Sequence, residues 1–172
     1  VYLGVRKEGR FQQRAAIKVV KRGLDSDEFL AKVQADFKIE AVDDGRPRER
    51  LSFGMYLEGQ WWRLRAREES FPNGDPVNSL DVAILQNNLL APVLGIGDPR
   101  SDERIDFVGG IRGLRELEQR VNSGEWEVAF ALFPTSIDQL FSVADAGLVM
   151  PPKSTWFEPK LRSGLIVRPL GE

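Results

Sequence analysis

Two stretches rich in aromatic and β-forming residues constrain the fold of this chain more than any other part of its sequence. They are RLSFGMYL at 50–57 and QWWRLRARE at 60–68, and only the dipeptide Glu58-Gly59 separates them. Apolar residues alternate in both stretches, as in strands that bury one face. A short connection that ends in Gly is typical of a tight turn, so the sequence predicts an antiparallel β-hairpin. Alternation groups three apolar residues on one face of it: Phe53, Met55 and Leu57.

Four helices are predicted by apolar residues at helical spacing and by capping residues at their ends. The first is expected to begin at Asp25 or Ser26 and to reach about Asp36. The longest is expected in NSLDVAILQNNLLAPVLGI at 78–96, where Pro92 should kink or end it. The other two are expected at about 114–122 and 135–147.

Further strands are predicted by short runs that are apolar or that alternate in polarity. They lie at 37–42, 104–110, 127–133 and 163–170. An antiparallel hairpin followed by helices and strands in turn predicts an α+β fold, which we expect to contain a mixed β-sheet and about four helices.

Length and composition favour one folded domain. With 172 residues and 42% apolar content the chain can bury a substantial core. We expect a single α+β domain over 1–172, in which 1–24 form an extended lead-in and 25–75 carry the first helix and the hairpin. The part at 76–172 would hold the other helices and strands and the MPPKSTWFEPK loop. Because the sequence begins at Val1 inside an apolar run, we expect it to be a fragment of a longer protein.

Two residue types are absent, and their absence excludes several kinds of chemistry from this chain. It contains no Cys, so it has no disulfide, thiol nucleophile or thiolate metal site. It contains no His, so it has no Ser-His-Asp triad and no imidazole base or ligand. A metal would have to bind oxygen atoms, as Mg²⁺ does, and the sequence assigns no residue to a metal site.

Charge and hydropathy restrict the partners of the chain. Its formal net charge is -2, which argues against a surface built to neutralise the phosphates of DNA. No run of eighteen or more apolar residues and no signal peptide is present, so we expect a cytoplasmic protein that does not cross a membrane.

The segment from Ala144 to Leu170 has the composition of a binding loop. After Pro151 and Pro152 it places three donor side chains in a row, and further cations follow. The run resembles the end of a phosphate-binding P-loop, but prolines supply no backbone N–H and the glycines of a P-loop are missing. We expect a simpler grip on a phosphate or carboxylate; alternatively the loop only hydrogen-bonds itself. The candidate ligand-binding residues here are Lys153, Ser154, Thr155, Lys160 and Arg162.

A second candidate anion site follows the strand expected at 104–110. Gly109, Gly110 and Arg112 lie where that strand leads into a helix, and a helix N-terminus attracts anions. The spacing is GGxxG rather than GxGxxG, so a tight turn between strand and helix is the alternative. Two acids near element ends, Asp106 and Asp145, are candidate catalytic carboxylates, although the sequence does not show whether any two carboxylates meet.

The second strand of the hairpin carries Arg63, Arg65 and Arg67 at alternate positions. This pattern is typical of a solvated sheet face. The alternative is a nucleotide base stacked on Trp61 beside these arginines.

Four sequence blocks are similar to a known protein family. They are LDVAILQNNLLAPVLGI, RIDFVGGIRGLRELE, FALFPTSIDQLFSVADAG and MPPKSTWFEPKLRSGLIVRPL, and they cover about 76–170. Together they resemble the C-terminal half of a bacterial and archaeal family catalogued as domain of unknown function 1015 (DUF1015), and 25–67 resemble it more loosely. The family has no settled activity. The N-terminal half of its longer members carries a segment similar to the nucleotide-using domains of ParB, sulfiredoxin and free serine kinase.

The resemblance and the residues together lead to three functional hypotheses. The first is the C-terminal part of a cytoplasmic enzyme that transfers phosphoryl groups on a small, serine-like metabolite, with Mg²⁺ and a nucleotide as candidate cofactors and an N-terminal half as its partner. The second is a non-catalytic ligand-binding or regulatory module. The third is an oligomerisation domain that uses Trp156 and Phe157 to form a homo-oligomer. The residues alone do not decide whether the chain is catalytic.

Overall fold

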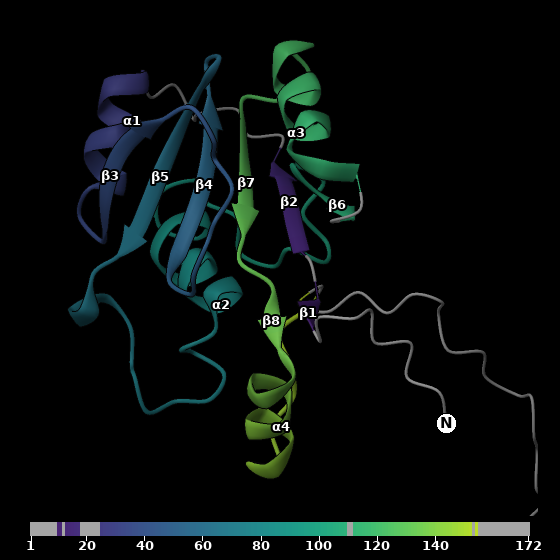
Figure 1. Ribbon diagram of the computed structural model, residues 1–172. Coiled ribbons are helices and arrows are strands. Elements are labelled where there is room, and N and C mark those ends of the chain that lie inside the picture. Colours follow the sequence, from purple (N-terminus) through teal and green to yellow (C-terminus); the bar gives the residue numbers. More distant parts are fainter. Residues whose placement is uncertain (1–9, 12, 18–24, 110–111, 153, 155–172) are drawn as a thin grey trace, which may run out of the picture.

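The computed structural model describes residues 10–11, 13–17, 25–109, 112–152 and 154, and only the backbone of those before residue 25. Six strands form one sheet in the order β3-β5-β4-β7-β2-β6, and every pair of neighbours is antiparallel (Figure 1). The strands are β2 (Gln13–Ile17), β3 (Phe37–Val42), β4 (Ser52–Leu57), β5 (Gln60–Ala66), β6 (Ile105–Gly109) and β7 (Val128–Leu132). Below β7 in the view, β1 (Arg10–Phe11) pairs with β8 (Thr135–Ser136).

Side-chain caps mark the starts of α1 and α4, whereas α2 and α3 begin without one. They are α1 (Ser26–Val33), the 3-10 turn η1 (Glu68–Ser70), α2 (Asp81–Leu85), the π-helix η2 (Gln86–Leu90), α3 (Gly113–Asn122) and α4 (Ile137–Asp145). Asp25 caps α1 by accepting a hydrogen bond from the N–H of Glu28 at 2.7 Å. Ser136 caps α4 in a capping box with Gln139.

The predicted hairpin is confirmed as β4 and β5. Glu58 and Gly59 have φ angles of 50° and 83°, the two positive values that a tight two-residue hairpin turn requires. The α+β class is likewise confirmed. Where we expected a mixed sheet, all pairings of the described strands are antiparallel, because β7 returns between β4 and β2 and opposes both in direction.

The segment predicted as the longest helix is not one continuous α-helix. Its α-helical part, α2, has five residues and then widens into η2, where the N–H of Ala91 donates to the carbonyl of Gln86 at 2.9 Å. Pro92 explains the change, because it has no N–H and its ring clashes with the carbonyl four residues earlier in a regular helix. The wide turn still buries Leu89 and Leu90.

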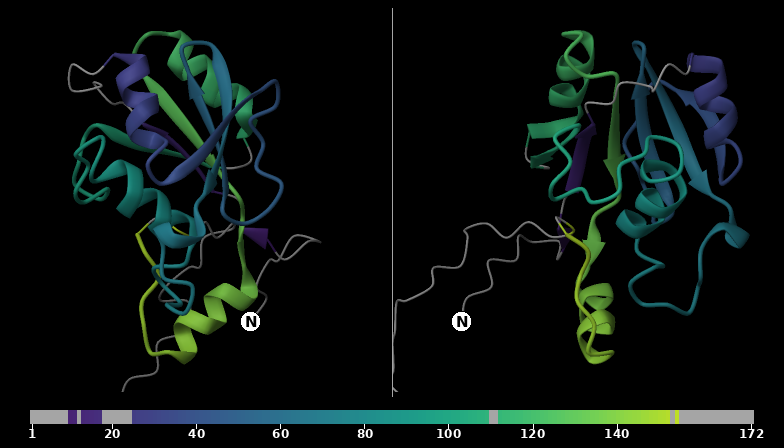
Figure 2. Two further views of the ribbon diagram at one scale, coloured as in Figure 1. Left: turned by 90° about the vertical axis from the view of Figure 1, so that its left-hand side faces the viewer. Right: turned by 180° about the vertical axis from the view of Figure 1, so that it is seen from behind.

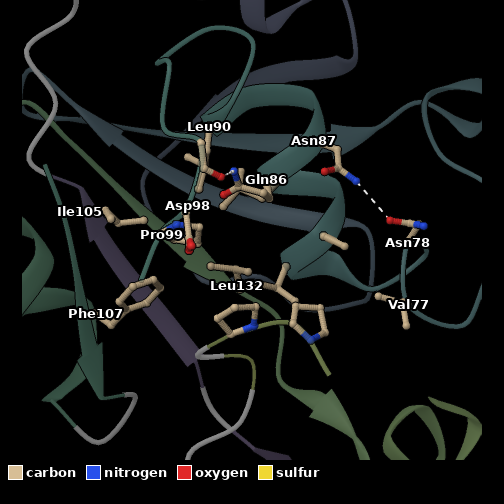
Figure 3. A pocket seen from close by; sticks show the side chains of 16 residues that line it. Val77, Asn78, Gln86, Asn87, Leu90, Asp98, Pro99, Ile105, Phe107 and Leu132 are labelled. Carbon is tan, nitrogen blue, oxygen red and sulfur yellow. Dashed lines mark hydrogen bonds between the residues drawn. The ribbon is translucent and has the colours of Figure 1, made fainter. Parts of the chain in front are cut away.

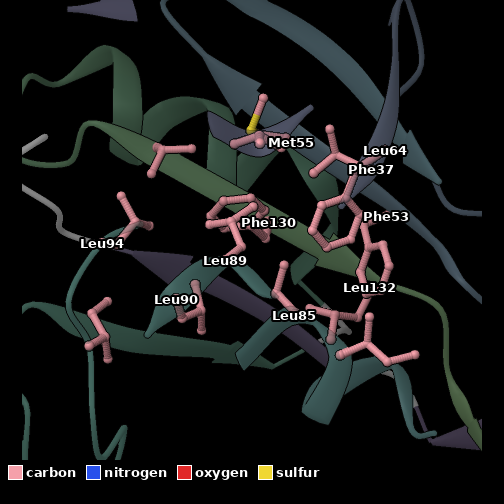
Figure 4. Packing of buried hydrophobic residues seen from close by; sticks show 14 of the residues in the cluster. Phe37, Phe53, Met55, Leu64, Leu85, Leu89, Leu90, Leu94, Phe130 and Leu132 are labelled. Atoms are coloured by element: carbon pink, nitrogen blue, oxygen red, sulfur yellow. The ribbon is translucent and has the colours of Figure 1, made fainter. Parts of the chain in front are cut away.

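The sheet is covered on both faces (Figure 2). Alternate residues of β4, β5 and β7 pack with α1, α2 and η2 on one face, and Figure 4 shows part of this main core. The other face packs against α3 through a smaller cluster that includes Trp61 and Leu117. The helix α4 follows β8 beyond the end of the main sheet and contacts the body through Val143.

Candidate functional site

A cavity of ≈340 Å³ opens beside α2 and η2 at one end of the main core (Figure 3). Strands β6 and β7, the turn at 97–99 and the double proline supply its other walls. Most of the lining is apolar, with a few amide side chains and one carboxylate, which is the usual composition of a small-molecule pocket. The lining residues are Val77, Asn78, Val82, Ala83, Leu85, Gln86, Asn87, Leu90, Gly97, Asp98, Pro99, Ile105, Phe107, Leu132, Pro151 and Pro152.

Gln86 holds one wall of the cavity to another. Its Nε2 donates to the carbonyl oxygens of Ile96 at 2.7 Å and Gly97 at 3.1 Å. Gln86, the first residue of η2, thereby fixes the segment that runs back past η2 toward β6. These two carbonyls also fix the orientation of the amide, because a flipped amide would place oxygen against oxygen. The Gln86 Oε1 is buried and has no hydrogen-bond partner.

Two arginine–aspartate pairs shape the turn that leads from η2 to β6. Arg104 donates to the carbonyl of Gly95 at 2.8 Å and binds the carboxylate of Asp102, so it closes the loop onto the end of the wide turn. Nearer the cavity, the side chain and backbone N–H of Arg100 bind Asp98 and lower the pKa of its carboxyl to about 2. Asp98 is therefore ionised throughout the physiological range and is already paired.

Asp81 is a buried carboxylate at the first residue of α2, next to the cavity wall. It is only 7% exposed, and its Oδ1 accepts a hydrogen bond from the N–H of Leu51 at 3.1 Å. Leu51 has a φ of 63°, an uncommon conformation for a branched side chain. The Asp81 Oδ2 is buried without a partner. Burial raises the pKa of Asp81 to about 6, against the lowering effects of the Leu51 N–H and of Arg50.

We expect this carboxyl to make the fold more stable at pH 5 than at pH 7.5. The folded state binds the proton more tightly than the unfolded state, whose pKa is 3.8. The cost of the buried charge is therefore fully present well above pH 6 and is relieved as the pH falls through 6 toward 4. At pH 5 the gain is about 1 kcal/mol in free energy of unfolding. Denaturation at both pH values should show this gain in the wild type and not in Asp81→Asn; equal pH dependence in the two proteins would contradict the assignment.

The double proline of the candidate binding loop reaches the cavity. Pro151 and Pro152 line it, and the next described residue, Ser154, is 1% exposed. The Ser154 N–H donates to the carbonyl of Pro151, its own carbonyl accepts from Thr135 Oγ1, and its hydroxyl is buried without a partner. Of the sequence-predicted residues of this loop, four lie outside the described part of the chain: Lys153, Thr155, Lys160 and Arg162.

The candidate carboxylate on β6, Asp106, lies on the opposite face of the sheet from the cavity. Ile105 and Phe107 face the cavity, so Asp106 between them points to the face covered by α3. There Asp106 binds Arg120 at 2.7 Å, and Arg120 also binds Glu116. The structure thus places Asp106 in an ion-pair network and does not bring it together with Ser154.

The remaining candidates are also apart from the cavity. Arg112 is exposed and pairs with Glu116 at 3.5 Å, as part of the same network. Gly109 ends β6 in register with Gln13, and Gly110 lies outside the described residues. Asp145 is exposed in the last turn of α4.

Trp61 is unavailable for stacking on a nucleotide base. It is 5% exposed, its Nε1 donates to Glu118 at 2.7 Å, and the backbone of Gly45 packs against its ring. The arginines of the same strand fit the solvated-face interpretation, because Arg63 pairs with Glu40 and Arg65 pairs with Glu49.

The described residues offer neither a metal-ion cluster nor a membrane span. No group of three or more Asp or Glu side chains in the described ranges is arranged to hold a metal ion. No helix in that part of the chain is long and apolar enough to cross a membrane.

Sequence reasoning missed most of the cavity. It assigned 78–96 to one long helix, and the apolar residues Leu80, Ile84, Leu85 and Leu89 of this segment are buried. It gave no role to Gln86 on the same segment or to Phe107 on β6, and it treated Asn78 only as a candidate helix cap, whereas α2 begins after Leu80 without a side-chain cap. The polar residues within this otherwise apolar segment were the only local sign in the sequence that it borders a cavity.

Comparison with known proteins gives a structure of similar fold and a family match to part of the chain. No curated protein matches this chain. Among solved structures, a mutant free serine kinase in complex with AMP is similar in fold, with a TM-score of 0.52 at 14% identity over 91% of this chain. The chain spans 57% of the length of that kinase.

The family match covers residues 16–83, which include α1 and the hairpin and end within α2. The sequence blocks after residue 83 that resemble the family therefore lie outside the match. By this match the chain is consistent with membership of the family described as Protein of unknown function (DUF1015).

Proposed function

We propose that this chain is part of a cytoplasmic enzyme that binds a phosphate-bearing or nucleotide ligand and transfers a phosphoryl group on a small metabolite. One observation carries the proposal: the Lys-Ser-Thr run follows directly on the two prolines that line the cavity. In the proposal, a ligand held in the cavity uses donors and cations of the sequence that follows these prolines. Reactions of this kind depend on positioning and on neutralising charge, which Lys, Arg and hydroxyl groups provide without His or Cys.

The fold comparison supports the same class of reaction. The similar kinase structure holds AMP, and this chain corresponds to little more than half of it. The proposal accordingly includes a further half of a longer protein, which would complete the site. Mg²⁺ remains part of the proposal, because it needs only one or two protein carboxylates when ligand phosphates supply the other oxygens.

The proposal predicts a specific loss on replacing Lys153 in the full-length protein. We expect Lys153→Ala to weaken binding of ATP or phosphoserine by about tenfold, since a hydrogen bond to a charged group contributes about 1.5 kcal/mol or more. Calorimetric titration with and without Mg²⁺ measures the affinity. In a thermal-shift assay, a ligand at a hundred times its dissociation constant should add about 2.7 kcal/mol of stability.

Lys32→Ala is the matched control for this experiment. Lys32 is an exposed lysine on α1 that pairs with Glu28 at 3.1 Å, and it does not line the cavity. Its replacement should leave ligand affinity unchanged. If Lys153→Ala also binds both phosphorylated ligands as the wild type does, the proposed function is wrong.

A further inference from the structure

We infer that the cavity takes the uncharged planar ring of the ligand, a nucleobase, and that the phosphate groups lie outside it. This inference rests on the proposed function and makes it more specific: the ligand is a nucleotide rather than a small phosphorylated metabolite bound by itself.

The charges around the cavity argue against a phosphate inside it. No Lys or Arg occurs among its described lining residues. The one charged residue among the described lining, Asp98, is an anion already bound by Arg100 at 2.8 Å. The adjacent helix α2 is a single short segment that begins with the buried carboxyl of Asp81. Among these described residues an anion would therefore lose its hydration and gain no counter-charge from them, which is strongly unfavourable.

The shape and chemistry of the walls suit a flat ring. Figure 3 shows Phe107, Leu132 and Gln86 around the same space, and the apolar side chains of Ile105 and Leu90 complete these walls. Phe107 supplies an aromatic ring on which a base can stack. A base is uncharged, so it gains from leaving water for such a surface.

Amide groups at the other end of the cavity can read the edge of a base. Asn78 Nδ2 donates to Asp75 at 2.8 Å, which turns Asn78 Oδ1 toward Asn87. The contact from Asn87 Nδ2 to Asn78 Oδ1 is long, at 3.4 Å, so a ligand donor can replace it. An amide pair presents both donors and acceptors, the groups that recognise the edge of adenine.

The test compares ligands that carry only one part of a nucleotide. In calorimetric titrations of the full-length protein, we expect adenosine to bind within about tenfold of AMP, and ribose 5-phosphate and inorganic phosphate to bind far more weakly. Phe107→Ala should weaken adenosine binding at least about fivefold, as loss of a stacking ring does. Phe107→Leu keeps an apolar side chain in case the smaller residue impairs folding, and it should also weaken adenosine binding. Phe141→Ala, which removes an exposed ring on α4, should leave adenosine binding unchanged.

The outcomes separate this inference from the proposed function. If ribose 5-phosphate and phosphate bind as tightly as AMP while adenosine does not bind, the inference is overturned and the phosphate-binding function stands. If adenosine binds as tightly as AMP and Lys153→Ala changes nothing, the inference stands and the phosphoryl-transfer function fails. Binding of none of these ligands would overturn both.

Discussion

Replacing Gly54 with alanine is expected to lower the free energy of unfolding by about 3 kcal/mol. A Cβ atom at Gly54 would lie 1.8 Å from the carbonyl oxygen of Gly45 and 2.8 Å from its carbonyl carbon. Both are backbone atoms, and Gly45 cannot withdraw freely because it packs against the ring of Trp61 on its other side. The central strand β4 would have to shift, together with its neighbours β5 and β7. Chemical denaturation followed by tryptophan fluorescence measures the loss.

Gly74→Ala is the matched control. A Cβ atom there meets no heavy atom within 4 Å, and Gly74 does not have a positive φ. We expect a change within about 0.5 kcal/mol, or a slight gain from the stiffer unfolded chain. Equal stabilities of the two variants would show that the close approach of Gly45 to Gly54 does not occur in the protein.

Phe130→Ala is expected to lower the free energy of unfolding by about 4 kcal/mol. Phe130 is completely buried on β7, opposite Met55 of β4, and Figure 4 shows it in the middle of the main core beside Leu89. Its removal leaves a void beneath the wide turn that the surrounding strands cannot fill without breaking their pairing. Because single domains have a stability of only about 5–15 kcal/mol, this loss should be visible as a large fall in melting temperature.

Phe141→Ala removes the same atoms from a side chain that is exposed to solvent. Phe141 lies on α4 and is 57% exposed, so we expect a change within about 0.5 kcal/mol. A loss at Phe141 as large as that at Phe130 would contradict the assignment of the core.

The core and the cavity depend on the same elements. Leu132 lies two residues after Phe130 on the same face of β7, and it also lines the cavity. In η2, Leu90 lies next to the core residue Leu89 and likewise lines the cavity. The wide turn of η2 thus packs one side against the sheet and presents another to the cavity. A ligand that binds there should therefore stabilise the whole domain, which is why a thermal-shift assay can detect it.

The candidate site illustrates where local patterns stop being informative. The double proline was recognised as part of a binding loop, and it does line the cavity. Its position near an element end made Asp106 a candidate catalytic carboxylate, whereas one residue of strand alternation turns it away from the cavity and into a pair with Arg120. Sequence spacing shows that Asp106 and Phe107 face opposite ways, but it does not show which face has the cavity.

The sequence by itself determined the local elements. The turn residues Glu58 and Gly59 set the hairpin, and Asp25 and Ser136 set the starts of α1 and α4, because turns and caps depend on contacts between residues only a few positions apart. Only the tertiary structure decided that β7 lies between β4 and β2, that Trp61 and Asp81 are buried, and that α2 widens beside a cavity. Strand order and burial depend on packing between residues far apart in the chain, so no local pattern encodes them.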